Sequence, residues 1–223
     1  MAVRPKILAL ANKITFEART GIPNVPSDPE YRILAEVVTD DQADVAMACK
    51  VRQARTLDDI ARRCGRSKEE ARRLLLELSH EGVVINFAEP GQSEDSYYLP
   101  CWVPGIMEMM VGNKEQAEKH PEIPRCFEEY TRKNMQLMAP NLPTGMGVMR
   151  VIPVESAIKS ENHVPTSDEL HGYIDGAWKI AVTGCSCRRV RRIMGEGCGH
   201  LEEDMCIMLD RAADFQIKSG HGH

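Results

Sequence analysis

The sequence predicts an α+β protein: a winged helix-turn-helix domain, then a helical connector, then a small cysteine-rich α/β region. Three observations predict this class. Two short amphipathic segments, each with a capping sequence at its start, are separated by a glycine turn, and two strand-like runs follow them. Four cysteines then gather near the end of the sequence. We therefore divide the chain into an arm (1–26), a winged-helix domain (27–104), a connector (105–148) and a cysteine-rich region (149–223).

Length and composition are those of a globular protein. The 223 residues are enough for one large domain or two small ones, each able to bury a core. Hydrophobic residues at 43% and charged residues at 27% exclude a disordered or collagen-like chain. The net charge of -5 argues against a large phosphate-facing surface, although it leaves room for a local basic patch.

Hydropathy predicts a cytoplasmic protein without a membrane span. No apolar run approaches the roughly 18 residues that a membrane helix needs. The early apolar run ends at Asn12 and is too short for the core of a signal peptide. Thiols stay reduced in the cytoplasm, so the eight cysteines are better interpreted as metal ligands or buried apolar residues than as a disulfide framework.

The arm and the start of the winged-helix domain come first. Residues 1–26 have mixed character and end in proline and glycine turn chemistry. Ser27, Pro29 and Glu30 form a helix start that leads into the apolar stretch 31–38. A further helix is expected at about 40–51.

The helix-turn-helix is the most legible local pattern. Its first helix begins at Thr56 with a variant capping box and stops at Gly65; its second begins at Ser67 with a full capping box and ends at Gly82. Apolar residues recur at i, i+3, i+4 and i+7 in both, namely Leu57, Ile60, Ala61 and Cys64, then Ala71, Leu74, Leu75 and Leu78.

Strands and further helices are expected after the helix pair. Runs 83–87 and 96–99, joined by a polar loop, predict the hairpin that makes the domain a winged helix. The connector should be helical around 106–118 and 124–138 and should loosen after that. The last region should hold strands at 149–154 and 180–183 with a helix at about 166–178 between them.

Four cysteines form the candidate metal site. Cys185, Cys187, Cys198 and Cys206 follow the pattern C-x-C-x10-C-x7-C, and thiolates gather in a small volume only where a cation offsets their charge. Intervening glycines allow close backbone approach, and the arginines that follow Cys187 could stabilise thiolates. The spacing matches neither the ferredoxin run nor a zinc ribbon, so iron–sulfur and zinc both remain open, as do buried thiols.

The other four cysteines are interpreted as structural thiols rather than metal ligands. Cys64 occupies an apolar position of the first helix and should lie in the core. Cys49, Cys101 and Cys126 are isolated in the sequence, so we expect buried or half-buried thiols there.

Several segments together resemble a family of iron–sulfur, ferredoxin-type proteins from anaerobic microbes that carry a winged-helix-like N-terminal region. The segments are Cys185-Ser186-Cys187-Arg188, Gly197-Cys198, Glu203 to Cys206, 213–222, 98–106 and 150–155. The resemblance implies a 4Fe–4S cluster held by Cys185, Cys187, Cys198 and Cys206, and low-potential electron transfer to redox partner proteins. Proteins of that family usually continue into a two-cluster ferredoxin module, which this sequence does not contain.

A DNA-binding regulator with a metal- or redox-sensing cysteine site is the alternative. Charge placement disfavours it, because the second helix of the pair carries three basic residues against four acidic ones and the wing loop is acidic. Basic residues are concentrated instead on the segment before it, where they favour a solvated or partner-docking face. We expect the winged helix to dock a protein.

Enzyme motifs are absent from the sequence. It contains no glycine-rich phosphate loop, nucleophile elbow or paired-histidine zinc motif. We therefore expect an electron carrier or a subunit of an oxidoreductase system, with no small-molecule substrate of its own.

Overall fold

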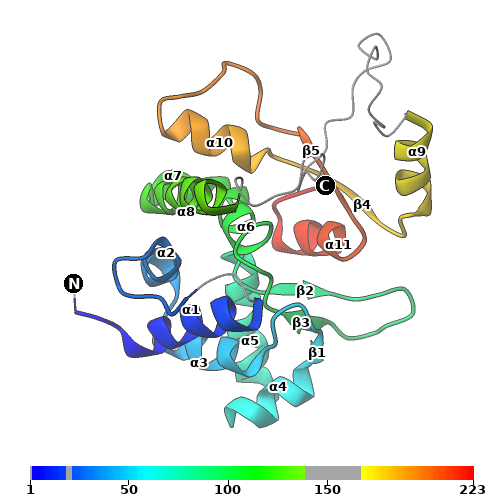
Figure 1. Ribbon diagram of the computed structural model, residues 1–223. Helices are drawn as coiled ribbons and strands as arrows, with labels where there is room; N and C mark the ends of the chain where they lie inside the picture. The colour runs from blue at the N-terminus through cyan, green and yellow to red at the C-terminus, as the bar shows by residue number, and fades with distance from the viewer. Residues whose placement is uncertain (1, 19–21, 139–166) are drawn as a thin grey trace.

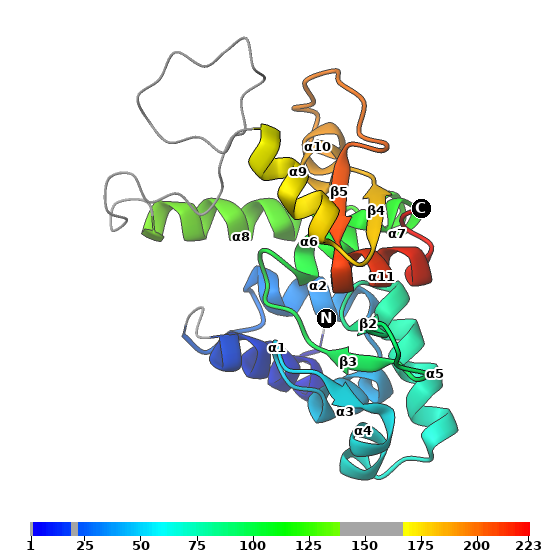
Figure 2. The same ribbon diagram turned by 90° about the vertical axis from the view of Figure 1, so that its right-hand side faces the viewer.

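The computed structural model describes residues 2–18, 22–138 and 167–223 (Figures 1 and 2). These residues form a mostly helical α+β structure with two small antiparallel sheets, as the sequence predicts at the level of fold class. The expected strand at 149–154 and the loosened end of the connector lie outside the described residues.

The N-terminal segment is a core helix. Helix α1 (Pro5–Ala18) buries Ile7, Leu10 and Ile14 completely, and the indole of Trp102 donates a hydrogen bond of 3.0 Å to the hydroxyl of Thr15. The expectation of an arm is therefore wrong for this stretch. The apolar positions follow helical spacing, but the segment has no capping residue to signal its start.

Two further helices continue the chain in the expected places. Helix α2 (Pro29–Val37) begins after Asp28, and α3 (Asp40–Ala48) begins with a capping box between Thr39 and Gln42. Helix α3 ends before residue 51, because the backbone turns extended at Cys49.

The predicted helix pair is confirmed. Helix α4 (Leu57–Cys64) is capped by the hydroxyl of Thr56, which accepts the amide hydrogen of Asp59, and it ends at Gly65 in the left-handed conformation. Helix α5 (Lys68–His80) is capped in the same way by Ser67. Their apolar faces join one core cluster with α1, α2 and α3.

A three-stranded sheet follows. The predicted hairpin is present as β2 (Ile85–Phe87) and β3 (Ser96–Tyr98), paired antiparallel. A short strand that the sequence did not reveal, β1 (Arg55–Thr56), pairs with the other edge of β3, which gives the order β1-β3-β2. Two residues are too few to show a period, so pairing could not be predicted there.

The described part of the connector, 105–138, contains three helices: α6 (Ile106–Gly112), α7 (Lys114–Lys119) and α8 (Glu122–Met138). The first predicted helix is split at Asn113, whose side chain caps α7. Helix α8 packs against α2, and α6 packs against α8.

From residue 167 onward, the C-terminal region consists of α9 (Ser167–Gly176), β4 (Ile180–Thr183), α10 (Ser186–Ile193), β5 (Cys206–Leu209) and α11 (Asp210–Ser219). Strands β4 and β5 form the second sheet. Helix α11 packs against this ribbon and also against β2 (Figure 1), and buried Phe215 joins Ile85 and Phe87 in a second small core.

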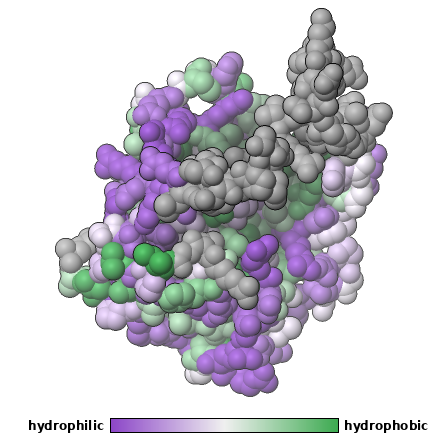
Figure 3. All heavy atoms as spheres, in the orientation of Figure 1, coloured by the Kyte–Doolittle hydropathy of each residue, from purple (hydrophilic) through white to green (hydrophobic). Residues whose placement is uncertain are grey.

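Within the described ranges, no helix combines the length and the apolarity that a bilayer crossing needs. Hydrophilic side chains are spread over the face in Figure 3, with hydrophobic patches between them.

Candidate metal centre

The second sheet brings two distant cysteines to one place. Cys185 caps the start of α10, and its sulfur accepts a hydrogen bond from the amide of Arg188 at 3.5 Å. Cys206 begins β5 and pairs with Thr183, which lies two residues before Cys185. Strand pairing therefore sets Cys206 beside the start of α10, where Cys187 also lies.

Three of the four thiols interact with one another. The pKa of Cys206 is raised to about 11, mainly by burial and then by the neighbouring thiols of Cys185 and Cys187. Burial also raises the pKa of Cys187, again with a contribution from Cys185. A thiolate at one position opposes ionisation at the next, so Cys187 and Cys206 stay protonated until a cation offsets their charge.

Cys198 lies in the connection between α10 and β5, within a run of exposed residues from 194 to 201. Within the described parts of the chain, no set of three or more His, Cys, Asp or Glu side chains is arranged as a metal site. The structure thus brings Cys185, Cys187 and Cys206 close enough to interact electrostatically, and it places Cys198 on the exposed connection.

The C-terminal end of the Cys198 connection is tied to the thiol cluster. The Cys185 amide donates to the carbonyl of Glu202 at 2.6 Å, and the Met205 amide donates to the carbonyl of Thr183 at 3.0 Å. The guanidinium of Arg188 donates to the carbonyl of Leu201 at 2.6 Å. The exposed residues 194–201 therefore lead from the end of α10 into a segment that is held beside the cluster.

A buried arginine anchors this region to the rest of the protein. Arg189 donates to the carbonyls of Val111 and Gly112 at 2.8 and 2.6 Å, and it pairs with the carboxylate of Glu202 at 3.0 Å. A side chain at Gly184 would begin 2.5 Å from this guanidinium, which explains the glycine there. The ion pair is almost wholly buried, with side-chain exposures of 3% and 6%.

The arginines after Cys187 divide into two groups. The charge of Arg188 lowers the pKa of Cys206, as the sequence suggested for this run. Arg189 and Arg192 instead bind Glu202, and the Arg192 hydrogen bonds are the main reason that the pKa of Glu202 falls to about 2. Arg189 and Arg192 therefore hold Glu202 in position rather than stabilise the charge of the thiols.

One acidic residue beside the cluster was missed from the sequence. Glu108 lies in the first turn of α6, accepts the amide hydrogen of Gly105 at 2.7 Å, and acts electrostatically on Cys187. Burial raises the pKa of Glu108 to about 7. Its capping position three residues after Gly105 was visible, but its proximity to Cys187 depends on the contact between α6 and α10.

The remaining cysteines differ in burial. Cys49 and Cys126 are buried, while Cys64 and Cys101 are half-buried. Cys64 packs against the main core, as its helical position predicted.

Comparison with protein-family models, with curated proteins and with solved structures finds no match. The function is therefore argued from the residues and their arrangement.

Proposed function

We propose that the C-terminal region binds an iron–sulfur cluster through Cys185, Cys187, Cys198 and Cys206, and that the protein transfers single electrons to a partner protein. The observation that carries this proposal is the mutual electrostatic interaction of Cys185, Cys187 and Cys206. Cys198 joins them from the exposed connection. Zinc is the alternative occupant of the same four thiolates.

The donor set suits a soft metal centre. Four cysteines are the usual ligands of a 4Fe–4S cluster, which supplies one-electron transfer when bound. The raised pKa values of Cys187 and Cys206 mean that binding must release protons, as expected for thiolate coordination. Arg188 contributes a positive charge near Cys206, and the buried Arg189–Glu202 pair keeps α10 in position.

The order of elements supports a winged helix. Helix α3, strand β1, the pair α4 and α5, and the hairpin β2–β3 occur in the sequence order of that fold, with β1 added to the hairpin. Fold alone does not assign a function, so its role is argued from the exposed side chains.

Those side chains favour docking to a protein over binding DNA. Lys68 forms ion pairs with Asp58 and Glu94, and Arg73 pairs with Glu77, so these cations are already neutralised. Leu76 lies on α5 with 45% of its surface exposed, an apolar group suited to a protein partner. A reading helix would instead need uncompensated positive charge.

Metal analysis of anoxically purified protein tests the cluster. We expect iron and acid-labile sulfide in near-equal amounts, with the broad visible absorption of a thiolate-bound iron–sulfur centre. Cys198→Ala should lose most of the metal, whereas the control Cys64→Ala, on α4, should keep it. Both variants should retain the wild-type helical circular dichroism.

Two outcomes would contradict the proposal. Stoichiometric zinc without sulfide would assign a structural zinc site instead. Unchanged metal content in Cys198→Ala would remove Cys198 from the ligand set.

A fluorescence titration with random-sequence duplex DNA at low salt tests the docking assignment. We expect no saturable binding at micromolar protein. Micromolar binding with a steep salt dependence would favour the regulator alternative.

A further inference from the structure

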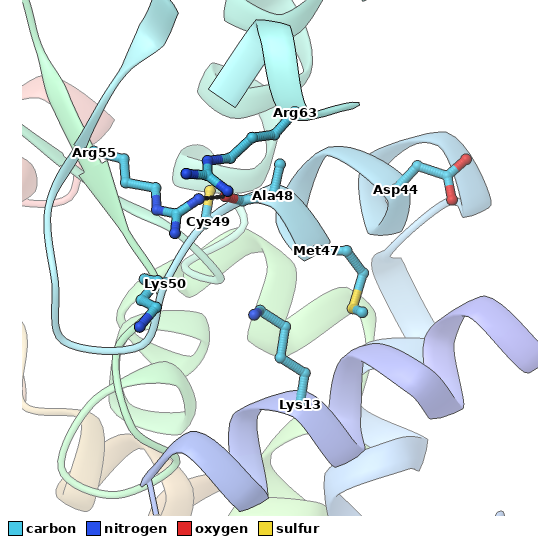
Figure 4. Close-up of a pocket in the computed structure, with 8 residues that line it drawn as sticks. All are labelled: Lys13, Asp44, Met47, Ala48, Cys49, Lys50, Arg55 and Arg63. Atoms are coloured by element: carbon cyan, nitrogen blue, oxygen red, sulfur yellow. Dashed lines mark hydrogen bonds between the residues drawn. The ribbon is translucent and has the colours of Figure 1, made fainter. Parts of the chain in front are cut away.

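A pocket between α1, α3, α4 and the segment before β1 gathers basic side chains. Its volume is about 270 Å³. Four cations line it, two lysines and two arginines, while only one carboxylate does (Figure 4). The lining residues are Lys13, Asp44, Met47, Ala48, Cys49, Lys50, Arg55 and Arg63.

The fold divides the basic residues that precede α5 into two groups. Arg62 pairs with Asp59 at 2.5 Å, and Arg66 pairs with Asp41 and Glu70, so these two arginines form structural ion pairs. Lys50, Arg55 and Arg63 instead turn to the pocket. They are joined there by Lys13, from a helix that the sequence analysis had not recognised.

The carboxylates around the pocket are already paired. Asp44 lines the wall, but Figure 4 shows its carboxylate turned away from the arginines, and it binds Lys6 at 2.6 Å. Glu17 and Asp59 do not line the pocket, but they pair with its cations: Glu17 with Lys13, and Asp59 with Arg63 and, at 3.6 Å, with Arg55. Glu17 also accepts the amide hydrogen of Val51. Four cations therefore stand against three carboxylates, which leaves the pocket with a net positive charge.

Several donors remain free to bind an anion. Among the described residues, Lys50 has no hydrogen-bond or ion-pair partner for its ammonium group. Arg55 uses one nitrogen to donate to the carbonyl of Ala48 at 3.0 Å, and Arg63 uses its Nε to bind Asp59. Each guanidinium carries five N–H donors, so both keep donors unused.

The floor of the pocket does not repel an anion. Cys49 is buried, and burial raises its pKa to about 12, so its thiol is neutral at physiological pH. Met47 adds an apolar side. A volume of about 270 Å³ is at the lower limit of small-molecule pockets, so it suits a phosphate-sized group with a short organic part.

We propose that this pocket binds the phosphate group of a small phosphorylated ligand through Lys13, Lys50, Arg55 and Arg63. Lysine and arginine are the side chains that recognise phosphate, lysine as a point charge and arginine through paired N–H donors. The site is separate from the thiol cluster, so it stands whether or not the cysteines hold a metal.

Titration of the full-length protein with inorganic phosphate tests the site. Calorimetry or ¹⁵N NMR at constant ionic strength should give saturable binding, with amide shifts at 47–50 and around Lys13. Lys50→Gln should weaken binding about tenfold, the effect of losing one charge-assisted hydrogen bond. Lys119→Gln, which removes an exposed lysine of α7, is the matched control and should bind as the wild type does.

A second variant, Arg63→Gln, and a second probe, random duplex DNA, complete the test. Arg63→Gln should also weaken phosphate binding, and melting curves without phosphate will show that each variant is folded. Equal affinities of Lys50→Gln and Lys119→Gln, or a response that never saturates, would overturn the proposal. So would tighter binding of random duplex DNA that depends on Lys50, because the pocket would then serve a nucleic-acid backbone.

Discussion

At the scale of single residues, the eight thiols have very different surroundings. Cys198 is exposed, Cys206 is half-buried beside two other thiols, and Cys49 and Cys126 are buried. Burial raises the pKa of Cys49 to about 12 and raises that of Cys126 as well. Because the thiolate is the reactive form, sequence position alone says little about which thiols react.

Alkylation of the metal-free protein checks these surroundings. With iodoacetamide at neutral pH, Cys198 should be modified first, and Cys49 at least ~100-fold more slowly, because a pKa raised by about three units leaves roughly a thousandth of the thiolate. Peptide mass spectrometry over time gives the order. Rapid modification of Cys49 in folded protein would show that α3 does not bury it.

At the scale of elements, the close contact between the end of α5 and the middle of α6 depends on one glycine. Gly82 has a φ of +84°, and a Cβ there would lie 2.5 Å from the backbone of Met109 and Met110. Neither the left-handed conformation nor the contact tolerates a side chain. This contact positions α6, which in turn carries Glu108 and the carbonyls that bind Arg189.

Gly82→Ala should therefore destabilise the protein by about 2–4 kcal/mol, combining strain with overpacking. Gly91→Ala is the matched control, because Gly91 has a similar φ of +87° but nothing within 4 Å of its Cβ position. It should cost only about 1 kcal/mol. Urea unfolding measures both, and equal losses would mean that α6 can shift to make room.

At the scale of the whole molecule, α10 is held to the connector by the buried pair of Arg189 and Glu202. Helix α11 makes a second link, since Asp214 accepts the amide hydrogen of Ala88 after β2 and pairs with Lys179 before β4. The wing loop is tied to the same helix, because Glu89 pairs with Arg211 and Asp95 pairs with Lys218. The cysteine region and the first sheet are thus packed as one unit.

Acid should weaken this arrangement through Glu202. Its pKa is lowered from 4.5 to about 2, so the stability it contributes is present above pH 4.5 and is lost as the pH falls toward 2. The shift corresponds to ~3 kcal/mol. Glu202→Gln should lose a comparable amount at pH 7 by leaving Arg189 buried without its counterion, and its difference from wild type should shrink by pH 3.

Urea unfolding at pH 7 and pH 3 makes that comparison. Glu203→Gln is the control, since its carboxylate is exposed and pairs only with Lys114, and it should change stability little at either pH. A Glu202→Gln deficit that stays constant with pH would mean that the lost stability does not come from ionisation of Glu202.

Local chemistry explains what was predictable. Capping residues, glycine stops and helical or alternating spacing act within a few residues, so α4, α5, the hairpin β2–β3 and β4 were found. Helix α1 was missed because it lacks a cap, α10 and α11 were missed because they are short and rich in charge, and β5 was missed because it has only four residues. The clustering of Cys185, Cys187 and Cys206 could be expected from their proximity in sequence.

By itself the sequence determined the fold class, the helix pair and the four candidate ligands, because each depends on neighbouring residues. Only the tertiary structure decided that Cys198 is exposed, that Glu108 lies beside Cys187, and that Lys13 joins Lys50, Arg55 and Arg63 around one pocket. These relations join residues far apart along the chain. They arise when helices bury their apolar faces together, and that packing has no local sequence signal.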